Sequence, residues 1–239
     1  MSTVHFVRHG QGTLDGGRYD RLSELGARQA EMLGKFWAAR KVPLDHVYSG
    51  TQDRHRQTAS IVADHYRRAG LVFPPVMSDE RFNEIDSLNI LEELIPLLAK
   101  ENGRFTELME RTRKALQVNA ADKILLFDRL MKMVMNAWME GTCASYGGMS
   151  WEEYRSRVLD THRDLVRCGD GSRVAVFTSG NPIGIYIGKA LELTDAKMLQ
   201  VVHTLFNTNV TSFVLRDSTV TLTTMNDVSH LDKELVTQK

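Results

Sequence analysis

Three adjacent residues near the start of the chain, Arg8-His9-Gly10, place a permanent positive charge beside an imidazole. An arginine side chain offers a planar fork of N–H donors that matches the oxygens of a phosphate and stays charged at any working pH. A neutral imidazole keeps a lone pair on one ring nitrogen, so it can attack phosphorus and form a covalent intermediate. The pair predicts chemistry on a phosphate or a similar oxyanion, with His9 as the nucleophile and Arg8 as a ligand of the phosphoryl group.

Two further segments carry groups that suit an anion. Arg54 follows a short apolar run, and Ser179-Gly180 follows another. Parallel sheets collect their ligands at the carboxyl ends of the strands, so these groups are expected to lie beside the first pair. The second run leads into a predicted helix, whose first N–H groups and partial positive charge attract anions. Pro182 near the first helical position, with Ser179 or Asn181 as the cap, suits that start.

A third segment, residues 80–86, supplies carboxyl groups from Glu80, Glu84 and Asp86. Breaking a phosphate ester leaves an alkoxide that needs a proton, and a carboxylic acid can supply it as a general acid. The negative charge of a nearby phosphate favours the protonated form of a carboxyl group, which suits this role near neutral pH. We therefore expect one of the three to protonate the leaving group.

The elements that must position these groups follow from the spacing of apolar residues. Apolar runs predict strands at 4–7, 45–50, 76–77 and 174–178, then a hairpin of 211–216 and 220–224 around Asp217-Ser218. Helical spacing predicts helices at 23–40, 53–69 and 183–193, with a glycine-rich loop over 10–17. Strands that alternate with helices are typical of a three-layer α/β/α fold with a mainly parallel central sheet.

Residues 87–168 have a different character, because they are rich in Leu and Met and show little strand pattern. The apolar positions at helical spacing include Leu130, Met131, Val134, Met135 and Trp138. We interpret 87–168 as a helical insertion, or cap, that covers the site within a single domain of residues 1–239. The methionines suit a ligand-facing surface or the filling of a core, and core filling is the favoured interpretation.

Composition excludes several other classes. The 239 residues hold 30 Lys plus Arg and 30 Asp plus Glu, so a formal net charge of zero gives no attraction to nucleic acid or an anionic membrane. No apolar run is long enough for a bilayer span, and the first predicted strand begins too early to leave room for a signal peptide. Cys143 and Cys168 are too few for a disulfide framework and lack metal-ligand spacing. We expect a cytoplasmic protein without a metal or another cofactor.

Several segments resemble, in order, motifs of the histidine phosphatase superfamily, the phosphoglycerate mutase-like proteins. Residues 4–11 resemble the Arg-His-Gly signature, 22–30 the first helix, 48–59 the second-arginine segment, 81–84 the acid-bearing segment, and 174–178 the strand before the second catalytic histidine. One Arg-His-Gly alone is weak evidence, whereas the ordered set is specific. A branch with Arg-His-Gly-Gln and a Tyr-Asp-x-Leu-Ser stretch, like residues 19–23, is the most similar.

The resemblance implies an activity and a role for each matched residue. It implies hydrolysis of a phosphomonoester through a phosphohistidine on His9, with Arg8 and Arg54 clamping the phosphoryl group. Glu84 is the implied proton donor, and Ser179 with Gly180 is the implied remainder of the phosphate site. The partner would be a small phosphorylated molecule or inorganic phosphate.

Two positions depart from the family pattern. Gly12 stands where the family usually has Ser or Thr, and Thr13 follows it. The second catalytic histidine would align with Ser179, and no histidine occurs in 174–184. Charge-assisted hydrogen bonds contribute roughly 1.5–3 kcal/mol and neutral ones roughly 0.5–1.5 kcal/mol, so the exchange predicts a rate lower by roughly one to two orders of magnitude. If serine merely takes the place of histidine, Ser179→His should raise the rate.

Two other functions remain open. A non-catalytic module that binds a phosphorylated ligand is favoured by the missing histidine, whereas a phosphoglycerate-type mutase needs the complete two-histidine site. Structural roles also compete: His9 as a buried core residue, Arg54 as a helix cap, Glu84 in a surface ion pair and Ser179 as a plain N-cap. His203 could replace the lost histidine, although a structural role is favoured. His55 is expected to point away from Arg54 and is left out of the site.

Overall fold

The computed structural model describes residues 1–13 and 20–238, which divide into two compact units. The first unit contains residues 1–84 and 157–239, and the second contains 85–156. The strands are β1 (Ser2–Arg8), β2 (His46–Ser49), β3 (Val76–Ser78), β4 (Arg173–Thr178), β5 (Val210–Arg216) and β6 (Thr219–Asp227). The helices of the first unit are α1 (Glu24–Ala39), α2 (Asp53–Arg68), α7 (Gly180–Ala190) and α8 (Asp195–Val202), with part of α6 (Trp151–Arg167).

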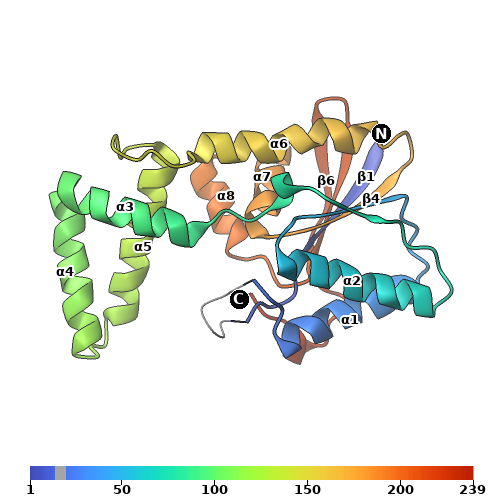
Figure 1. The fold of residues 1–239 in the computed structure, drawn as a ribbon, viewed down its shortest axis with the longest axis horizontal. Helices are drawn as coiled ribbons and strands as arrows, with labels where there is room; N and C mark the ends of the chain where they lie inside the picture. Colours follow the sequence, from blue (N-terminus) through green and yellow to red (C-terminus); the bar gives the residue numbers. More distant parts are fainter. Residues whose placement is uncertain (14–19, 239) are drawn as a thin grey trace. The chain divides into compact units, whose positions relative to one another are not determined.

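The six described strands form one sheet in the order β3-β2-β4-β1-β5-β6. Figure 1 labels β1, β4 and β6 of this sheet. The first four run parallel, and β5 and β6 add an antiparallel hairpin at one edge. Arg8 at the end of β1 is level with Thr178 at the end of β4, and Ser49 of β2 is level with Phe177. The predicted α/β class and mainly parallel sheet are confirmed, and three strand ends reach the same edge.

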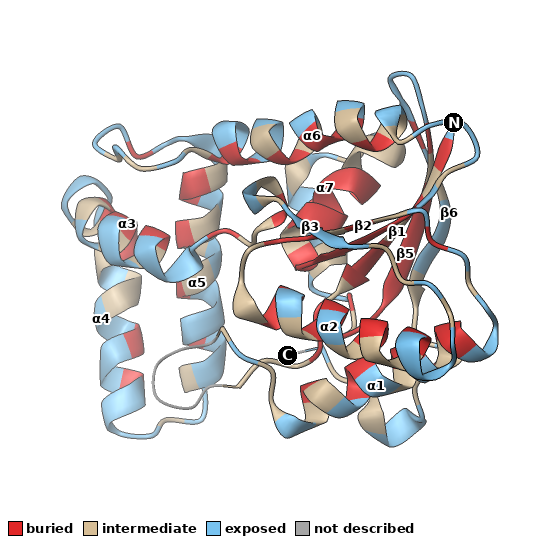
Figure 2. Cartoon of the chain, turned by 45° about the vertical axis from the view of Figure 1, so that its right-hand side comes forward, coloured by how far each residue is buried: buried red, intermediate tan, exposed pale blue. Residues whose placement is uncertain are grey.

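The two faces of the sheet are covered by different helices. Val7 points into a core with Leu33 and Trp37 of α1 and Val62 of α2. The preceding residue on β1, Phe6, points to the opposite face, where its ring centroid lies 4.6 Å from that of Tyr186 on α7. Figure 2 shows buried residues along β1 and β5 and on parts of α1, α2 and α7, whereas β3 and β6 are largely exposed. This alternation produces the predicted three layers.

The N-terminus of α1 packs directly against the loop that follows β1. Ser23 is the N-cap, and its hydroxyl accepts a hydrogen bond of 3.0 Å from the Gly26 N–H. A Cβ on Gly10 would lie 2.3 Å from the Gly26 carbonyl oxygen, and a Cβ on Gly26 would lie 2.1 Å from the Gln11 carbonyl oxygen. Two glycines are therefore required for the loop and the helix to approach this closely.

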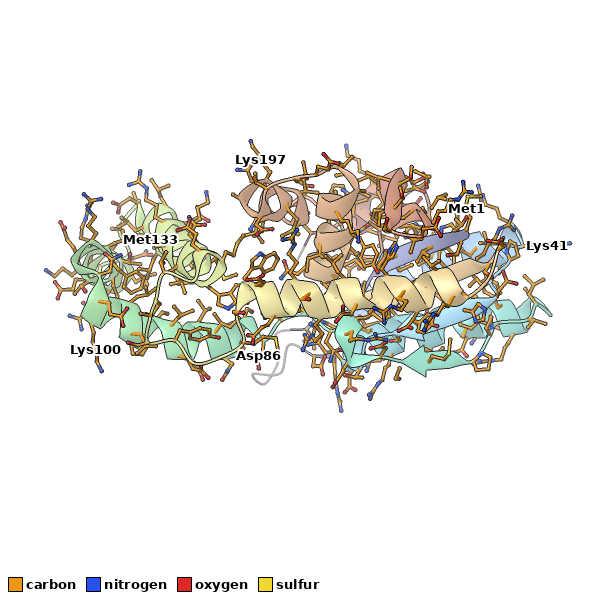
Figure 3. All side chains as sticks on the ribbon, turned by 90° about the horizontal axis from the view of Figure 1, so that it is seen from above. Met1, Lys41, Asp86, Lys100, Met133 and Lys197 are labelled. Atoms are coloured by element: carbon orange, nitrogen blue, oxygen red, sulfur yellow. The ribbon has the colours of Figure 1, made fainter. Side chains whose placement is uncertain are left out.

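The second unit is helical, as the sequence predicts. It contains α3 (Ser87–Glu101), α4 (Gly103–Gln117), α5 (Lys123–Glu140) and the first residues of α6. Leu130, Val134 and Trp138 are buried, whereas Met133, labelled in Figure 3, is half-buried. That this region covers the site, within a single domain, stays a prediction.

Two boundaries differ from the sequence-based expectation. The helix expected at 183–193 begins at Gly180 and ends at Ala190. Pro182 lies inside its first turn, where backbone N–H groups have no partner within the helix, so proline removes no bond there. The glycine-rich loop and the Tyr-Asp stretch fall partly on residues 14–19, outside the described part of the chain. No described helix combines the length and apolar character needed to cross a bilayer.

The close approach at Gly26 yields a stability prediction. Alanine is normally the better helix former, but here its methyl group would overlap the Gln11 backbone, so Gly26→Ala should destabilise the protein by about 1–3 kcal/mol. The control is Gly103→Ala in α4, where nothing lies within 4 Å of the new methyl group and stability should be unchanged or slightly higher. Urea unfolding measures both variants, and equal stabilities would contradict the packing described.

Candidate active site

His9 follows the end of β1 and is held by backbone bonds on both sides. Its N–H donates to the Thr178 carbonyl at 2.9 Å, and its side chain is almost fully buried. Ring atom Nδ1 lies 2.6 Å from the carbonyl oxygen of Gly10. Because a carbonyl oxygen can only accept, Nδ1 carries the hydrogen and the lone pair is left on Nε2. The backbone therefore selects the tautomer in which Nε2 is the nucleophile.

The surroundings of His9 keep the ring neutral. Its pKa lies well below the ordinary value of 6.5, first because burial removes water and then because Arg54 and Arg8 repel a further positive charge. The Gly10 carbonyl opposes this effect but does not reverse it. A neutral ring is the form that can attack phosphorus. The lowered pKa and the fixed tautomer of His9 therefore both keep a lone pair on Nε2.

Both predicted arginines lie in this neighbourhood. Arg54, in the first turn of α2, is buried and donates to Asp20 Oδ1 and to Gln52 Oε1, each at 2.9 Å. Arg8 donates to the carbonyl of Leu205. These bonds fix the two guanidinium groups close enough to His9 to shift its pKa. Their phosphate-binding role stays a prediction.

Glu84 is joined to the same cluster through two side-chain amides. Its carboxylate accepts from Asn181, at 2.7 Å from the side-chain Nδ2 and 3.3 Å from the backbone N–H. Its own N–H donates to Gln52 Oε1 at 3.0 Å, the oxygen that also accepts from Arg54. The first turn of α7 thus holds a carboxylate in this structure, as expected for a helix N-terminus. Of the three predicted carboxylates, the structure connects Glu84 to Arg54.

Ser179 is the N-cap of α7, but its hydroxyl makes no bond to the helix. It is fully buried, and Oγ lies 2.6 Å from Nε2 of His55. The rings of His55 and His9 are 5.6 Å apart. The expectation that His55 lies outside the site is wrong. His55 points about 100° away from Arg54 around the helix. This direction leads toward the end of β4, the strand beside β2, where Ser179 lies.

Several supporting residues were missed by sequence reasoning. Thr58 Oγ1 accepts from the Gly10 N–H at 3.2 Å, and Asn207 Nδ2 donates to the His9 carbonyl at 3.3 Å. Thr58 belongs to residues 48–59, which resemble the second-arginine segment of the family, and this resemblance was a usable signal. Asn207 lies far along the chain and carried no signal in the sequence. Its hydrogen bonds to His9 and Thr237 in the structure place it beside the candidate site.

Other candidates lie apart from this cluster. His203 follows the last turn of α8 and has an exposed side chain. A cavity of about 710 Å³ is lined by Met1, Asp170 and Arg216, so it lies at the opposite end of β1 from His9. Within residues 1–13 and 20–238, no group of three or more His, Cys, Asp or Glu side chains is arranged to hold a metal ion.

Comparison with models of protein families gives one match. The model of the histidine phosphatase superfamily (branch 1) matches residues 4–119 and 126–228. No curated protein matches the chain in sequence.

Three solved structures share the fold. YhfR of Bacillus stearothermophilus is 22% identical, with a TM-score of 0.63 over 96% of this chain and 99% of that one. A mutant phosphoserine phosphatase of Entamoeba histolytica, in complex with phosphoserine, is 17% identical, with a TM-score of 0.60 over 97% and 100%. The alpha-ribazole phosphatase of Shigella flexneri is 16% identical, with a TM-score of 0.60 over 95% and 96%. Likeness at this identity establishes the fold alone.

The state of His9 can be measured directly. Nitrogen NMR of labelled imidazoles should show Nδ1 protonated, Nε2 unprotonated and a pKa below 6.5. Arg54→Gln should raise the pKa of His9, because Arg54 repels a positive charge on the ring more strongly than Arg8 does. Arg56→Gln, at an exposed position two residues along, should leave this pKa unchanged. A wild-type titration at or above 6.5 would contradict the site electrostatics.

Proposed function

The chain belongs to the histidine phosphatase superfamily, and we propose that it hydrolyses phosphomonoesters through a phosphohistidine on His9. The observation that carries this proposal is the bond from His9 Nδ1 to the Gly10 carbonyl, which puts the ring hydrogen on Nδ1 and the lone pair on Nε2. The charges of Arg8 and Arg54 add a reason for a phosphate to bind there. Membership of the family supports the reaction class, and the tautomer of His9 supports its role as the nucleophile.

In the first step, Nε2 of His9 attacks phosphorus and the bond from phosphorus to the ester oxygen breaks. Arg8 and Arg54 bind the phosphoryl oxygens and stabilise the charge that builds on them. Glu84 gives its proton to the departing oxygen, so the alcohol leaves neutral. The link from Glu84 to Arg54 through Gln52 supports a position near the scissile bond.

In the second step, a water molecule attacks the phosphoryl group and the bond from phosphorus to Nε2 breaks. The carboxylate of Glu84, now without its proton, accepts one from the water. Inorganic phosphate leaves, and His9 returns to its neutral form. No metal ion takes part in either step.

The start of α7 completes the proposed phosphate site. The hydroxyl of Ser179 and the N–H of Gly180 take the place of the second histidine as donors to the phosphoryl group. A neutral hydroxyl is a weaker donor than a charged imidazole, so we expect a slower enzyme than a two-histidine site would give. The carboxylate of Glu84 already occupies the N–H of Asn181, which leaves Gly180 as the backbone donor.

The substrate is proposed to be a small phosphorylated molecule. Among the structures of similar fold, one contains phosphoserine, and another is a phosphatase named for alpha-ribazole. These names support the size and class of the ligand and do not identify it. A second candidate, a phosphate-binding module without turnover, is favoured only by Ser179 in place of a histidine.

The central test compares wild type with His9→Ala on an aryl phosphate. We expect turnover in the wild type and its loss in the variant, with an acid-labile phosphoenzyme trapped only in the wild type. His203→Ala, an exposed histidine in the same unit, should keep wild-type activity. Binding of inorganic phosphate without turnover in any variant would favour the binding module.

The role of Glu84 is tested by the leaving group. Glu84→Gln should lower kcat on alkyl phosphates by about 100-fold or more, because the alkoxide cannot leave without a proton. Turnover of p-nitrophenyl phosphate, whose leaving group needs no proton, should fall far less. An equal loss on both substrates would mean that Glu84 supports the site but does not donate the proton.

A further inference from the structure

His55 is a fully buried histidine beside the proposed nucleophile, and the mechanism above gives it no part. Its ring lies 5.6 Å from that of His9, and its Nε2 lies 2.6 Å from Ser179 Oγ. We propose that His55 and Ser179 act as a pair: His55 donates from Nε2 to Ser179 Oγ, and the serine hydroxyl donates to the phosphoryl group. This inference rests on the proposed function and extends it. Within this pair, Ser179 is the catalytic residue because it contacts the phosphoryl group, and His55 is a positioning residue.

The tautomer of His55 follows from the other side of its ring. Nδ1 has no hydrogen-bond partner among the described residues. A Cβ on Gly50 would lie 2.3 Å from Nδ1, so this nitrogen faces the Gly50 backbone. The N–H of Gly50 is already used, because it donates to the Phe177 carbonyl at 3.0 Å. A lone pair tolerates contact with a C–H group better than an N–H does, so the hydrogen belongs on Nε2.

The direction of the serine hydroxyl follows from that tautomer. If Nε2 carries the hydrogen, Ser179 Oγ accepts it and the hydroxyl hydrogen remains for another acceptor. The cap position does not use the hydroxyl, since Ser179 makes no side-chain bond to α7. Ser179 follows the last residue of β4 and His9 follows the last residue of β1, and these two strands are neighbours in the sheet. A phosphoryl group on His9 is therefore the acceptor that the geometry offers.

Burial also determines which form of His55 takes part. Its pKa lies well below 6.5, first because of burial and then because of the neighbouring His9 and Arg54. The ring is therefore a neutral N–H donor. Nε2 of His55 already lies 2.6 Å from Ser179 Oγ, and the other side of the ring lies against Gly50, so the His55 ring occupies the space that a larger side chain at position 179 would need. Contrary to the expectation from sequence alone, Ser179→His by itself should lower the rate, because the new ring would meet His55.

The pairing has one chemical rival. If Nδ1 carried the hydrogen, Nε2 would accept the serine proton, and Ser179 would become an activated nucleophile. The trapped phosphoenzyme would then be an acid-stable phosphoserine and not an acid-labile phosphohistidine. Nitrogen NMR of His55 distinguishes the tautomers whether or not turnover is detected, and a protonated Nδ1 would overturn the proposal.

The main experiment moves the imidazole from one position to the other. His55→Ala and Ser179→Ala should each lower kcat on an aryl phosphate by about 10- to 100-fold with little change in KM, and the double alanine variant should be no worse than either. His55→Ala/Ser179→His should recover activity above His55→Ala, because the ring then reaches the phosphoryl group from α7. His65→Ala, on the same helix, is the matched control and should match wild type.

A second pair of variants separates hydrogen bonding from packing. His55→Gln keeps an N–H donor near Ser179, whereas His55→Met fills similar space without one. We expect the glutamine variant to be clearly more active than the methionine variant at equal thermal stability. Equal activities of the glutamine and methionine variants, or a His55→Ala/Ser179→His variant no more active than His55→Ala, would overturn the pairing.

The failures of the two proposals are distinguishable. An active wild type, an inactive His9→Ala and an unaffected His55→Ala would remove only the pairing. If the wild type shows no turnover, the proposed hydrolysis fails, and the pairing is then judged by affinity for orthovanadate, which mimics the transferring phosphoryl group. The pairing predicts weaker binding by His55→Ala and Ser179→Ala than by His65→Ala, and equal binding by all three would overturn it.

Discussion

The hydrogen bond between His9 and the Gly10 carbonyl is the constraint on which the site depends. It determines which nitrogen can attack, and it holds only if that carbonyl keeps its direction. The Gly10 N–H is bound by Thr58, the next N–H along by Gln29 Oε1, and the chain is pressed against Gly26. Several contacts from α1 and α2, and no single strong interaction, therefore hold the Gly10 carbonyl oxygen in place.

Helix α2 does three different tasks within its first turns. Arg54 and Thr58, one turn apart, lie on one side of the helix and bind Asp20, Gln52 and the Gly10 N–H. His55, about 100° around the helix from Arg54, reaches Ser179. The parallel pairing of β2 with β4 and of β4 with β1 brings all three destinations to the same edge. A shift of α2 would move the cation, the buried histidine and the nucleophile loop together.

The sequence predicts the parts of the site that strand ends determine. Arg8, His9 and Arg54 follow apolar runs whose carboxyl ends meet at one edge, so their proximity is a consequence of parallel pairing. His55 and Asn207 are different, because their roles arise from contacts between segments far apart in sequence. The start of α7 was placed at residue 183 and lies three residues earlier, at Gly180. Pro182 therefore falls inside the first turn, where proline is tolerated. Periodicity carries no information about which buried side chains meet.

The exchange of histidine for serine at position 179 has a different meaning once His55 is considered. A serine alone would give one neutral hydrogen bond, of roughly 0.5–1.5 kcal/mol, in place of a stronger charge-assisted one. A serine whose oxygen already accepts from a buried N–H is polarised, and hydrogen bonds in such chains strengthen one another. Both side chains are fully buried, so the hydroxyl is shielded from bulk water. Under the proposed pairing, the bond between Ser179 and His55 influences the rate more than the identity of residue 179 alone.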